Sequence, residues 1–542
     1  MPETVLDRLV GRFLAHHATF HPVDATFMGL PGQDARLPPA GHDAIERERD
    51  GVAALLRDLD AAPIDDASGP RLDARLMRAA LIHARAALDR WPRFRQPSWY
   101  TGEAAFGVVS LLLPTAPAGA ADALAGRLDA LPAFLAAGSA FLSGQPTPAT
   151  WCERARRECE ALGRLLTEEL PRHPLWRNAL HRPAADAVAA ATSFARSLAD
   201  LPSREPACGR DYLFLLMREV HGLPWSPEEA AALAREAFDE LGERIARHPA
   251  RDAAPSPTVP AADLPAAYRR WHERALDDAA DLVTPAAEYG LSFQPLPPWA
   301  RAVAGDLYFL SYRCPPALAA GAGSVYWTAP VEQPVVAIKQ THAVHHGSIG
   351  HHTQNARARA APSRLARLAG TDGASGLAFL SAGTMVEGWS CYATELIAEA
   401  PGFYTPADEL ASLQAERRNA GSVLADVGLH AGGWSLERMA AFYRDEAGFP
   451  EARVAGETVR NSILPATRLM YWLGTKQIKD LRRELGGPPR PFHDELISHG
   501  HVPVAWAAEE MRAGGRRPPG EPSRQAAVGD LRREVAGGPM IG

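Results

Sequence analysis

The stretch "THAVHHGSIGHHTQ" (residues 341–354) contains five of the nineteen histidines of this 542-residue chain. They are His342, His345, His346, His351 and His352. Neutral imidazoles are common zinc ligands, and in the HExxH pattern two of them project from one face of a helix toward the same ion. Because five imidazoles fall within eleven positions, the stretch predicts a metal site rather than a solvated helix face.

The spacing of these histidines requires an interruption of the helix. His345 and His351 are six positions apart, so a regular helix would turn them to different faces. Gly347 and Gly350 lie between them and permit a bulge or a break. We therefore expect one broken helix to bring the two rings together.

A further ligand is expected from "SAGTMVEGWSCYATELIAEA" (residues 381–400), which reads as a helix. Glu387 and Glu395 lie there among apolar neighbours, where a carboxylate is costly unless it is paired or binds a cation. The alternative is that Glu395 and Glu399 are surface residues, which we accept for Glu399. Glu387, near Trp389, is the predicted ligand.

Most of the remaining chain has apolar residues at helical spacing, as in residues 72–91, 121–142 and 226–248. Between residues 290 and 330, aromatic and β-branched residues are interrupted by Pro and Gly, which predicts two or three short strands in one small sheet. The predicted fold class is mainly α, with two lobes around a central cleft.

The length of the chain exceeds what one core usually fills, so we predict two lobes. The first is an N-terminal helical lobe (1–250), and the second is a metal-site lobe (260–512). Residues 513–542 are polar and rich in Gly, Pro and Arg, which predicts a flexible tail. The Pro- and Ala-rich residues 249–265 are the candidate boundary, although they could also form a surface loop.

Composition narrows the class of partner. The formal net charge of −7 argues against a general nucleic-acid-binding protein, which needs a basic surface. No apolar run approaches the roughly 20 residues that span a bilayer, and residues 1–17 lack the pattern of a secretion signal. The five cysteines are scattered, without a CxxC pair. We expect a cytoplasmic protein that binds a small molecule or a short peptide, with no nucleic acid or membrane as partner.

Several segments resemble bacterial proteins of the DUF885 family, which are zincin-like and are thought to be metal-dependent hydrolases or peptidases. "HHGSIGHHTQ" (345–354) resembles the family pattern HExxPGHHxQ, and "EGWSCYATE" (387–395) resembles EGWxxYxE. "DVGLHAGGWS" (426–435), "PATRLMYWLGTKQIKDLRRE" (465–484) and "HPVDATFMGLPG" (21–32) also resemble family segments. The resemblance implies a mostly helical, zincin-like fold and a divalent cation, Zn²⁺ first and Fe²⁺ or Mn²⁺ as alternatives.

The resemblance also implies roles for individual residues. By position, His345, His351 and Glu387 become the metal ligands, and His352 competes with His351 for that role. Which of the five histidines coordinate stays open from the sequence.

His430 and Tyr471 stand where the family has a histidine and a tyrosine, and such groups could hydrogen-bond an oxyanion beside the metal. Asp426 could orient a histidine from outside the ligand set. The alternative for all three is a buried hydrogen-bond network, since buried polar groups must be bonded in any case.

Two departures from the family bear on chemistry. His346 stands where the family has the glutamate that would act as general base. One interpretation is that His346 is the base, since an imidazole can accept a proton near neutral pH; the other is that His346 is itself a ligand, together with His342 one turn before it. Asn419 and Ser422 stand where arginines are expected in the family. Those arginines could hold a substrate carboxylate.

We therefore expect a metal-dependent enzyme with a hydrolase-type site. It would act on a small amide, peptide-like or amino-acid-derived substrate, either by hydrolysis or in a non-hydrolytic tailoring step of specialised metabolism. The alternative is a non-catalytic, metal-stabilised pseudoenzyme or binding protein, and likeness of fold does not choose between them.

Overall fold

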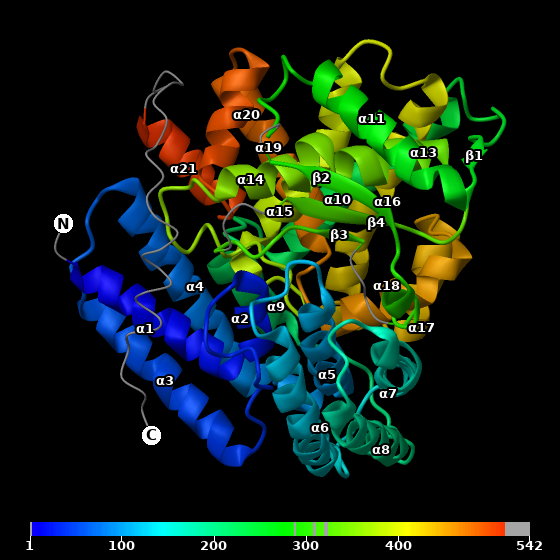
Figure 1. The fold of residues 1–542 in the computed structure, drawn as a ribbon. Coiled ribbons are helices and arrows are strands. Elements are labelled where there is room, and N and C mark those ends of the chain that lie inside the picture. Colours follow the sequence, from blue (N-terminus) through cyan, green and yellow to red (C-terminus); the bar gives the residue numbers. More distant parts are fainter. Residues whose placement is uncertain (1–2, 287–288, 307–310, 319–322, 375, 515–542) are drawn as a thin grey trace.

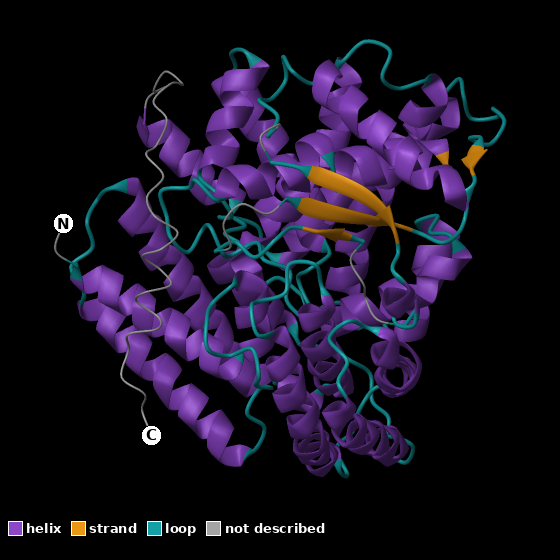
Figure 2. Ribbon diagram, viewed as in Figure 1, coloured by secondary structure: helices purple, strands orange, loops and turns teal. Residues whose placement is uncertain are grey.

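The computed structural model describes residues 3–286, 289–306, 311–318, 323–374 and 376–514. These residues form a mainly helical molecule with small sheets (Figures 1 and 2), which confirms the mainly α part of the predicted fold class. The predicted tail lies outside the described residues from 515 onward, and residues 513 and 514 belong to the last helix.

The N-terminal half is a succession of helices. Ser226 shows how the local sequence sets their ends: its hydroxyl accepts a hydrogen bond from the Glu229 N–H, and the Glu229 carboxylate accepts one from the Ser226 N–H. The helices are α1 (Val5–Phe20), α2 (Pro22–Met28), α3 (His42–Ala61), α4 (Ser68–Arg90), α5 (Pro97–Leu112), α6 (Ala120–Leu142), α7 (Ala149–Arg164), α8 (His181–Ser197), α9 (Arg210–Leu215) and α10 (Pro227–Arg247).

The predicted small sheet has three strands. β4 (Ser324–Thr328) lies in the middle, parallel to β2 (Leu291–Pro295) and antiparallel to β3 (Tyr312–Arg313). A second, two-stranded sheet that the sequence analysis did not predict pairs β1 (Thr258–Val259) with β5 (Gln333–Pro334). Figure 2 shows the three-stranded sheet surrounded by helices.

The C-terminal half returns to helices, which include the widened π-helical segments η7 (Ile338–His345) and η8 (Ser348–His352). The main helices are α11 (Leu264–Asp278), α14 (Thr353–Ala358), α15 (Gly383–Leu396), α16 (Pro406–His430), α17 (Leu436–Ala441), α18 (Glu451–Ile463), α19 (Leu469–Leu485), α20 (Pro489–Ser498) and α21 (Val504–Gly514).

The two halves share their hydrophobic cores. One cluster joins side chains of α1, α3 and α4 to side chains of α15, α20 and α21. Two further clusters also contain residues from both sides of 249–265, which is a largely exposed stretch. Burial of apolar surface therefore holds the halves together rather than giving each its own core. Among the described residues, no helix is both long and apolar enough to cross a membrane.

Candidate metal centre

The helix that carries the histidines is broken, as the spacing of His345 and His351 predicted. Gly347 (φ −93°, ψ −144°) separates η7 from η8, and Gly350 (φ −80°, ψ −129°) interrupts η8. A Cβ atom at Gly350 would lie 2.0 Å from the carbonyl oxygen of His345. Only glycine allows the chain to fold back this closely.

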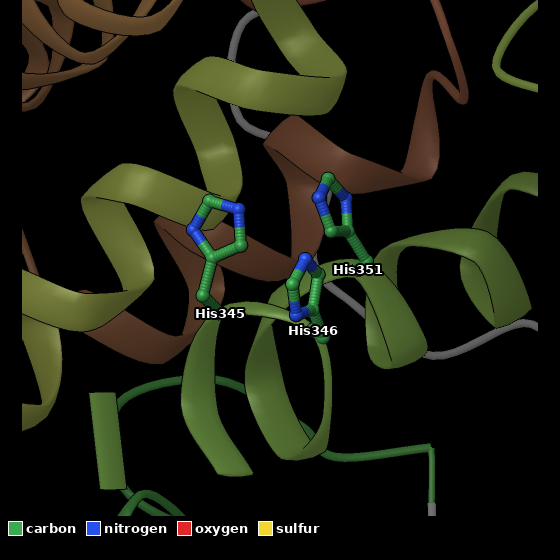
Figure 3. Close-up of side chains that lie close together, drawn as sticks. All are labelled: His345, His346 and His351. Atoms are coloured by element: carbon green, nitrogen blue, oxygen red, sulfur yellow. The ribbon is translucent and has the colours of Figure 1, made fainter. Parts of the chain in front are cut away.

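The break gathers three imidazoles at one point (Figure 3). One ring nitrogen from each of His345, His346 and His351 lies within 4.8 Å of the other two. The rings of His346 and His351 each stand nearly perpendicular to the ring of His345, with centroids 4.9 Å apart in both pairs. Ring edges, which carry the nitrogen lone pairs, can thus converge on one cation.

Glu387 supplies a carboxylate to the same point. Its Oε2 lies 3.9 Å from His345 Nε2 and 3.8 Å from His351 Nε2, and all three side chains are mostly buried. Tetrahedral zinc with bonds of about 2.0–2.1 Å holds its ligand atoms about 3.4 Å apart. The three imidazole nitrogens lie within 4.8 Å of one another, somewhat wider than this, and Glu387 lies beside two of the rings without belonging to that set.

Close contact between two helices fixes the position of Glu387. α15 packs against η7, η8 and α19. At the contact with α19, a Cβ atom on Gly388 would lie 2.6 Å from the backbone of Gly474. The glycine of the EGW motif thus lets α15 approach α19 closely and holds the carboxylate of the preceding residue over the histidines.

Burial keeps the imidazoles neutral. It lowers the pKa of His345, His346 and His351 well below the usual value, and the neighbouring rings lower each pKa further. Burial raises the pKa of Glu387, which Arg460 partly counteracts. Metal ligands must be neutral imidazoles and ionised carboxylates. The imidazoles meet this condition, and a cation among them would favour the carboxylate form of Glu387.

Tyr326, on β4, orients one of the three rings. Its hydroxyl lies 3.0 Å from Nδ1 of His346 and 2.6 Å from Nδ1 of His342. The contact leaves Nε2 of His346 available for the group, as partners of metal-binding histidines usually do. The sequence analysis did not single out Tyr326, because "GSVYWTAP" (323–330) signals only a strand.

Two of the five histidines lie outside the group of three. Nε2 of His352 is 2.6 Å from the carbonyl oxygen of Tyr289, and its Nδ1 is 3.3 Å from the Tyr312 hydroxyl. Adjacent residues on a helix point about 100° apart. The structure accordingly brings His351 into the group and turns His352 away from it, while His342 hydrogen-bonds to Tyr326 and stacks on Tyr268.

His430 and Asp426 form a buried network away from these residues. His430 Nε2 lies 3.0 Å from the carbonyl oxygen of Asn461 and 3.6 Å from Asp426 Oδ1. Burial lowers the pKa of His430 to about 4 and raises that of Asp426 to about 7. Of the two roles considered for them, this geometry fits the structural one.

Tyr471, in contrast, lies beside the metal-type residues. It hydrogen-bonds to Glu387, and Nη2 of Arg460 is 3.5 Å from its hydroxyl. Arg460 was not singled out because it belongs to none of the quoted motifs. Neither Asn419 nor Ser422 lines the cavity described below: Asn419 bonds Cys391 Sγ and Ser422 bonds the Arg418 carbonyl.

A family described as "Bacterial protein of unknown function (DUF885)" matches residues 22–511 of this chain. The chain belongs to the DUF885 family. Comparison with curated proteins found no significant match.

Two solved structures are similar to this DUF885 chain. One is "a putative lipoprotein of unknown function" from Shewanella oneidensis, with 16% identity and a TM-score of 0.72 over 93% of this chain and 99% of that one. The other is a "putative lipoprotein" from Colwellia psychrerythraea, with 16% identity and a TM-score of 0.72 over 94% of this chain and 99% of that one. These likenesses concern the fold, and the expected cytoplasmic location stays a prediction.

The histidine group of this DUF885 chain opens into a cavity of about 560 Å³. Its wall includes His345, His346, His351 and Glu387, together with Tyr471 and Arg460. Helices α1, α3, α4 and α5 of the N-terminal half contribute the other large part of the wall. A cavity of this size suits a small molecule rather than a folded partner.

Proposed function

We propose that this chain is a metal-dependent enzyme that converts a small amide or amino-acid-derived compound inside the cavity. The observation that carries the proposal is the convergence of three neutral imidazoles, with a buried carboxyl beside two of them. Zn²⁺ suits these ligand types best, and Fe²⁺ or Mn²⁺ are the alternatives.

His346 is a ligand rather than a general base in this proposal. Its ring nitrogen lies as close to the group as those of His345 and His351, and Tyr326 hydrogen-bonds its other nitrogen. The donor set is then three imidazoles and the Glu387 carboxylate. A cation held by this set would supply Lewis-acid polarisation of a substrate carbonyl or hydroxyl.

The chain's own residues provide the rest of the site. Arg460 and the hydroxyl of Tyr471 lie next to Glu387 and are suited to stabilise negative charge that develops on a substrate oxygen. If His346 is a ligand, the family's general base is lost. We therefore favour a conversion such as elimination, cyclisation or rearrangement over peptide hydrolysis, which is the second candidate.

Metal binding is tested with a matched pair of variants. His346→Asn and His342→Asn each remove an imidazole that contacts the Tyr326 hydroxyl, one helical turn apart, but only His346 belongs to the group of three. Elemental analysis should find one transition metal per chain in the unaltered protein. In chelator competition, His346→Asn should lose more than the 10- to 100-fold affinity that outer partners contribute, while His342→Asn loses less. A metal-free protein, or equal losses in both variants, would contradict the proposal.

Activity separates the enzyme from a pseudoenzyme. Metal-loaded and chelator-treated protein are compared on a panel of aminoacyl amides, dipeptides and amino-acid-derived hydroxy or carbonyl compounds. Metal-dependent conversion of any member supports the proposal. Metal binding without conversion of any member favours the pseudoenzyme, and conversion that survives metal removal would also overturn it. Dipeptide cleavage that appears only in His346→Glu would support the loss of hydrolysis in the natural protein.

A further inference from the structure

A second polar group lines the same cavity and has no role in the function proposed above. It comes from α1, α2, α3 and α5 and from the turn after α4, and it includes the family-like segment 21–32. Its charged and polar members are His17, His21, Asp24, Glu48, Arg93 and Glu103.

One carboxylate of this group is already neutralised. Arg93 binds Glu48 with both arms of its guanidinium, at 2.9 Å to Oε1 and 2.6 Å to Oε2. Arg154, which also lines the cavity, is paired with Glu158 at 2.7 Å. Both arginines are therefore already paired, although Arg93 also lowers the pKa of Asp24 and of Glu103 through its charge.

Asp24 and Glu103 remain. Oδ1 of Asp24 accepts a hydrogen bond from the Ala374 N–H at 3.2 Å, and its Oδ2 is 3.8 Å from Nε2 of His17. Burial lowers the pKa of His17 well below its usual value, so this ring is neutral and provides no positive charge. A Cβ atom on Gly373 would lie 2.1 Å from Asp24 Oδ1, so glycine is needed there to leave room for the carboxyl.

Glu103 is the unusual member. Its side chain is 2% exposed, and its Oε2 has no hydrogen-bond partner among the residues that the structure describes. Arg127 is attracted to Asp34 first and to Glu103 second. Burial and the charge of Asp24 raise the pKa of Glu103 to about 8, which the charges of two arginines and a hydrogen bond with Trp99 only partly oppose. An unpartnered buried acceptor on a cavity wall calls for a donor from a ligand.

An organic cation fits this wall better than a second metal ion. In the described part of the chain, no three donor atoms of this group lie within 4.8 Å of one another, as they do at the histidine group. An ammonium group donates up to three hydrogen bonds of about 2.8–3.0 Å and tolerates acceptors that are further apart. The aromatic rings of Phe13, Phe20 and Trp91 on the same wall suit the alkyl part of such a cation.

We propose that Asp24 and Glu103 form a subsite for a primary or secondary ammonium group of the substrate. The rest of the molecule would extend through the cavity toward the histidine group. This assigns an amine-bearing substrate class and rests on the proposed function, because it gives the same cavity its second anchor. Binding of the amine itself requires only the wall, not the metal.

The test measures binding of n-pentylamine and of n-pentanol to the full-length protein by calorimetry at pH 7. It is done once after chelator treatment and once with one equivalent of Zn²⁺ restored. The amine should bind at least about 10-fold more tightly than the alcohol in both states, since a hydrogen bond to a charged group is worth about 1.5–3 kcal/mol and 1.4 kcal/mol is tenfold in affinity. Glu103→Gln and Asp24→Asn should each remove most of this preference.

Glu510→Gln is the control, because Glu510 is a mostly buried carboxyl that pairs with Arg71 and does not line the cavity. It should leave the preference unchanged. Equal affinity for amine and alcohol in the unaltered protein would overturn the proposal even if the variants fail to fold. So would a second metal equivalent that is lost in Glu103→Gln. Amine binding that persists in chelated protein, with no conversion of any substrate, would leave the subsite standing and count against only the proposed function.

Discussion

Two histidine groups face the same cavity, and their rings are arranged differently. The first lies in "HHATFH" (residues 16–21), where the rings of His17 and His21 stack with centroids 4.7 Å apart and planes 18° apart. The second is the group of His345, His346 and His351. In it the rings of His345 and His346 have centroids 4.9 Å apart and planes 87° apart. Among the described residues no third donor joins the stacked pair within 4.8 Å, whereas ring nitrogens of His345, His346 and His351 all lie within 4.8 Å of one another.

The backbone produces this difference. α1 is a regular helix up to Phe20, and His21 follows it as the C-cap. Residues four apart on such a helix lie above one another, so their rings stack. η7 and η8 are widened and separated at Gly347, so rings from the two segments approach from different directions. Density of histidine alone does not build the metal-type site; the interruption of the helix does.

The largest expected effect comes from closing that interruption. In Gly350→Ala the added Cβ would meet the carbonyl oxygens of His345 at 2.0 Å and Val344 at 2.3 Å. Because both contacts are backbone atoms, the segment must shift as a whole. We expect a loss of about 4 kcal/mol of unfolding free energy, typical of severe core changes, together with loss of metal binding. Urea unfolding and elemental analysis measure the two effects.

Gly11→Ala is the matched control, since Gly11 lies in α1 and an added Cβ would meet no atom within 4 Å. Alanine at an unstrained helical position stabilises by about 0.4–1 kcal/mol. If Gly350→Ala were as well tolerated as Gly11→Ala and kept its metal, the break would not be what assembles the group.

On the cavity wall near α1, the charged pair of Glu48 and Arg93 contributes to stability. The stability of the protein should therefore depend on pH. Burial raises the pKa of Glu48, but the charge and hydrogen bonds of Arg93 outweigh it and hold the pKa at about 2. A depressed carboxyl pKa adds stability above the unfolded value of about 4.5, and this stability is lost as pH falls from there toward 2. The shift corresponds to about 3 kcal/mol.

Glu48→Gln should therefore destabilise the protein by about 3 kcal/mol at pH 7. The difference from the unaltered protein should shrink between pH 4.5 and 3 in urea unfolding. Glu46→Gln on the same helix, where the carboxylate pairs with Arg49 but is 65% exposed, should cost less than about 1 kcal/mol. A penalty for Glu48→Gln that stays constant down to pH 3 would show that shape rather than charge holds this wall.

The sequence predicted the fold class from local patterns. Helical periodicity identified α4, α6 and α10, and aromatic residues interrupted by Pro and Gly identified the strands around β4. The shared cores could not be predicted, because they depend on which distant apolar faces meet. Residues 249–265 have the composition of a boundary, yet the hydrophobic clusters extend across them.

At the site, the sequence indicated candidate donors in the histidine stretch and one glutamate in a neighbouring motif. His345, His351 and Glu387 were expected to converge, and the helix break and the apolar surroundings of the glutamate were both visible. The choice between His351 and His352 could not be made from the sequence, because it depends on a rotation of about 100° along a helix. Nothing in the sequence marked Glu103 as a site residue, because Asp24 and most of the other cavity-lining groups come from other helices.

The smallest effect concerns the hydroxyl that orients His346. Tyr326→Phe removes the contact to Nδ1 of His346 and leaves the ring's packing intact. Loss of such an outer partner lowers metal affinity about 10-fold or somewhat more. Tyr312→Phe is the matched control, because its hydroxyl lies 3.3 Å from His352, outside the group. Chelator competition should find weaker binding in Tyr326→Phe alone. Equal affinities in both variants would mean that the rings are held by packing, and that His346 needs no hydroxyl to face the other two.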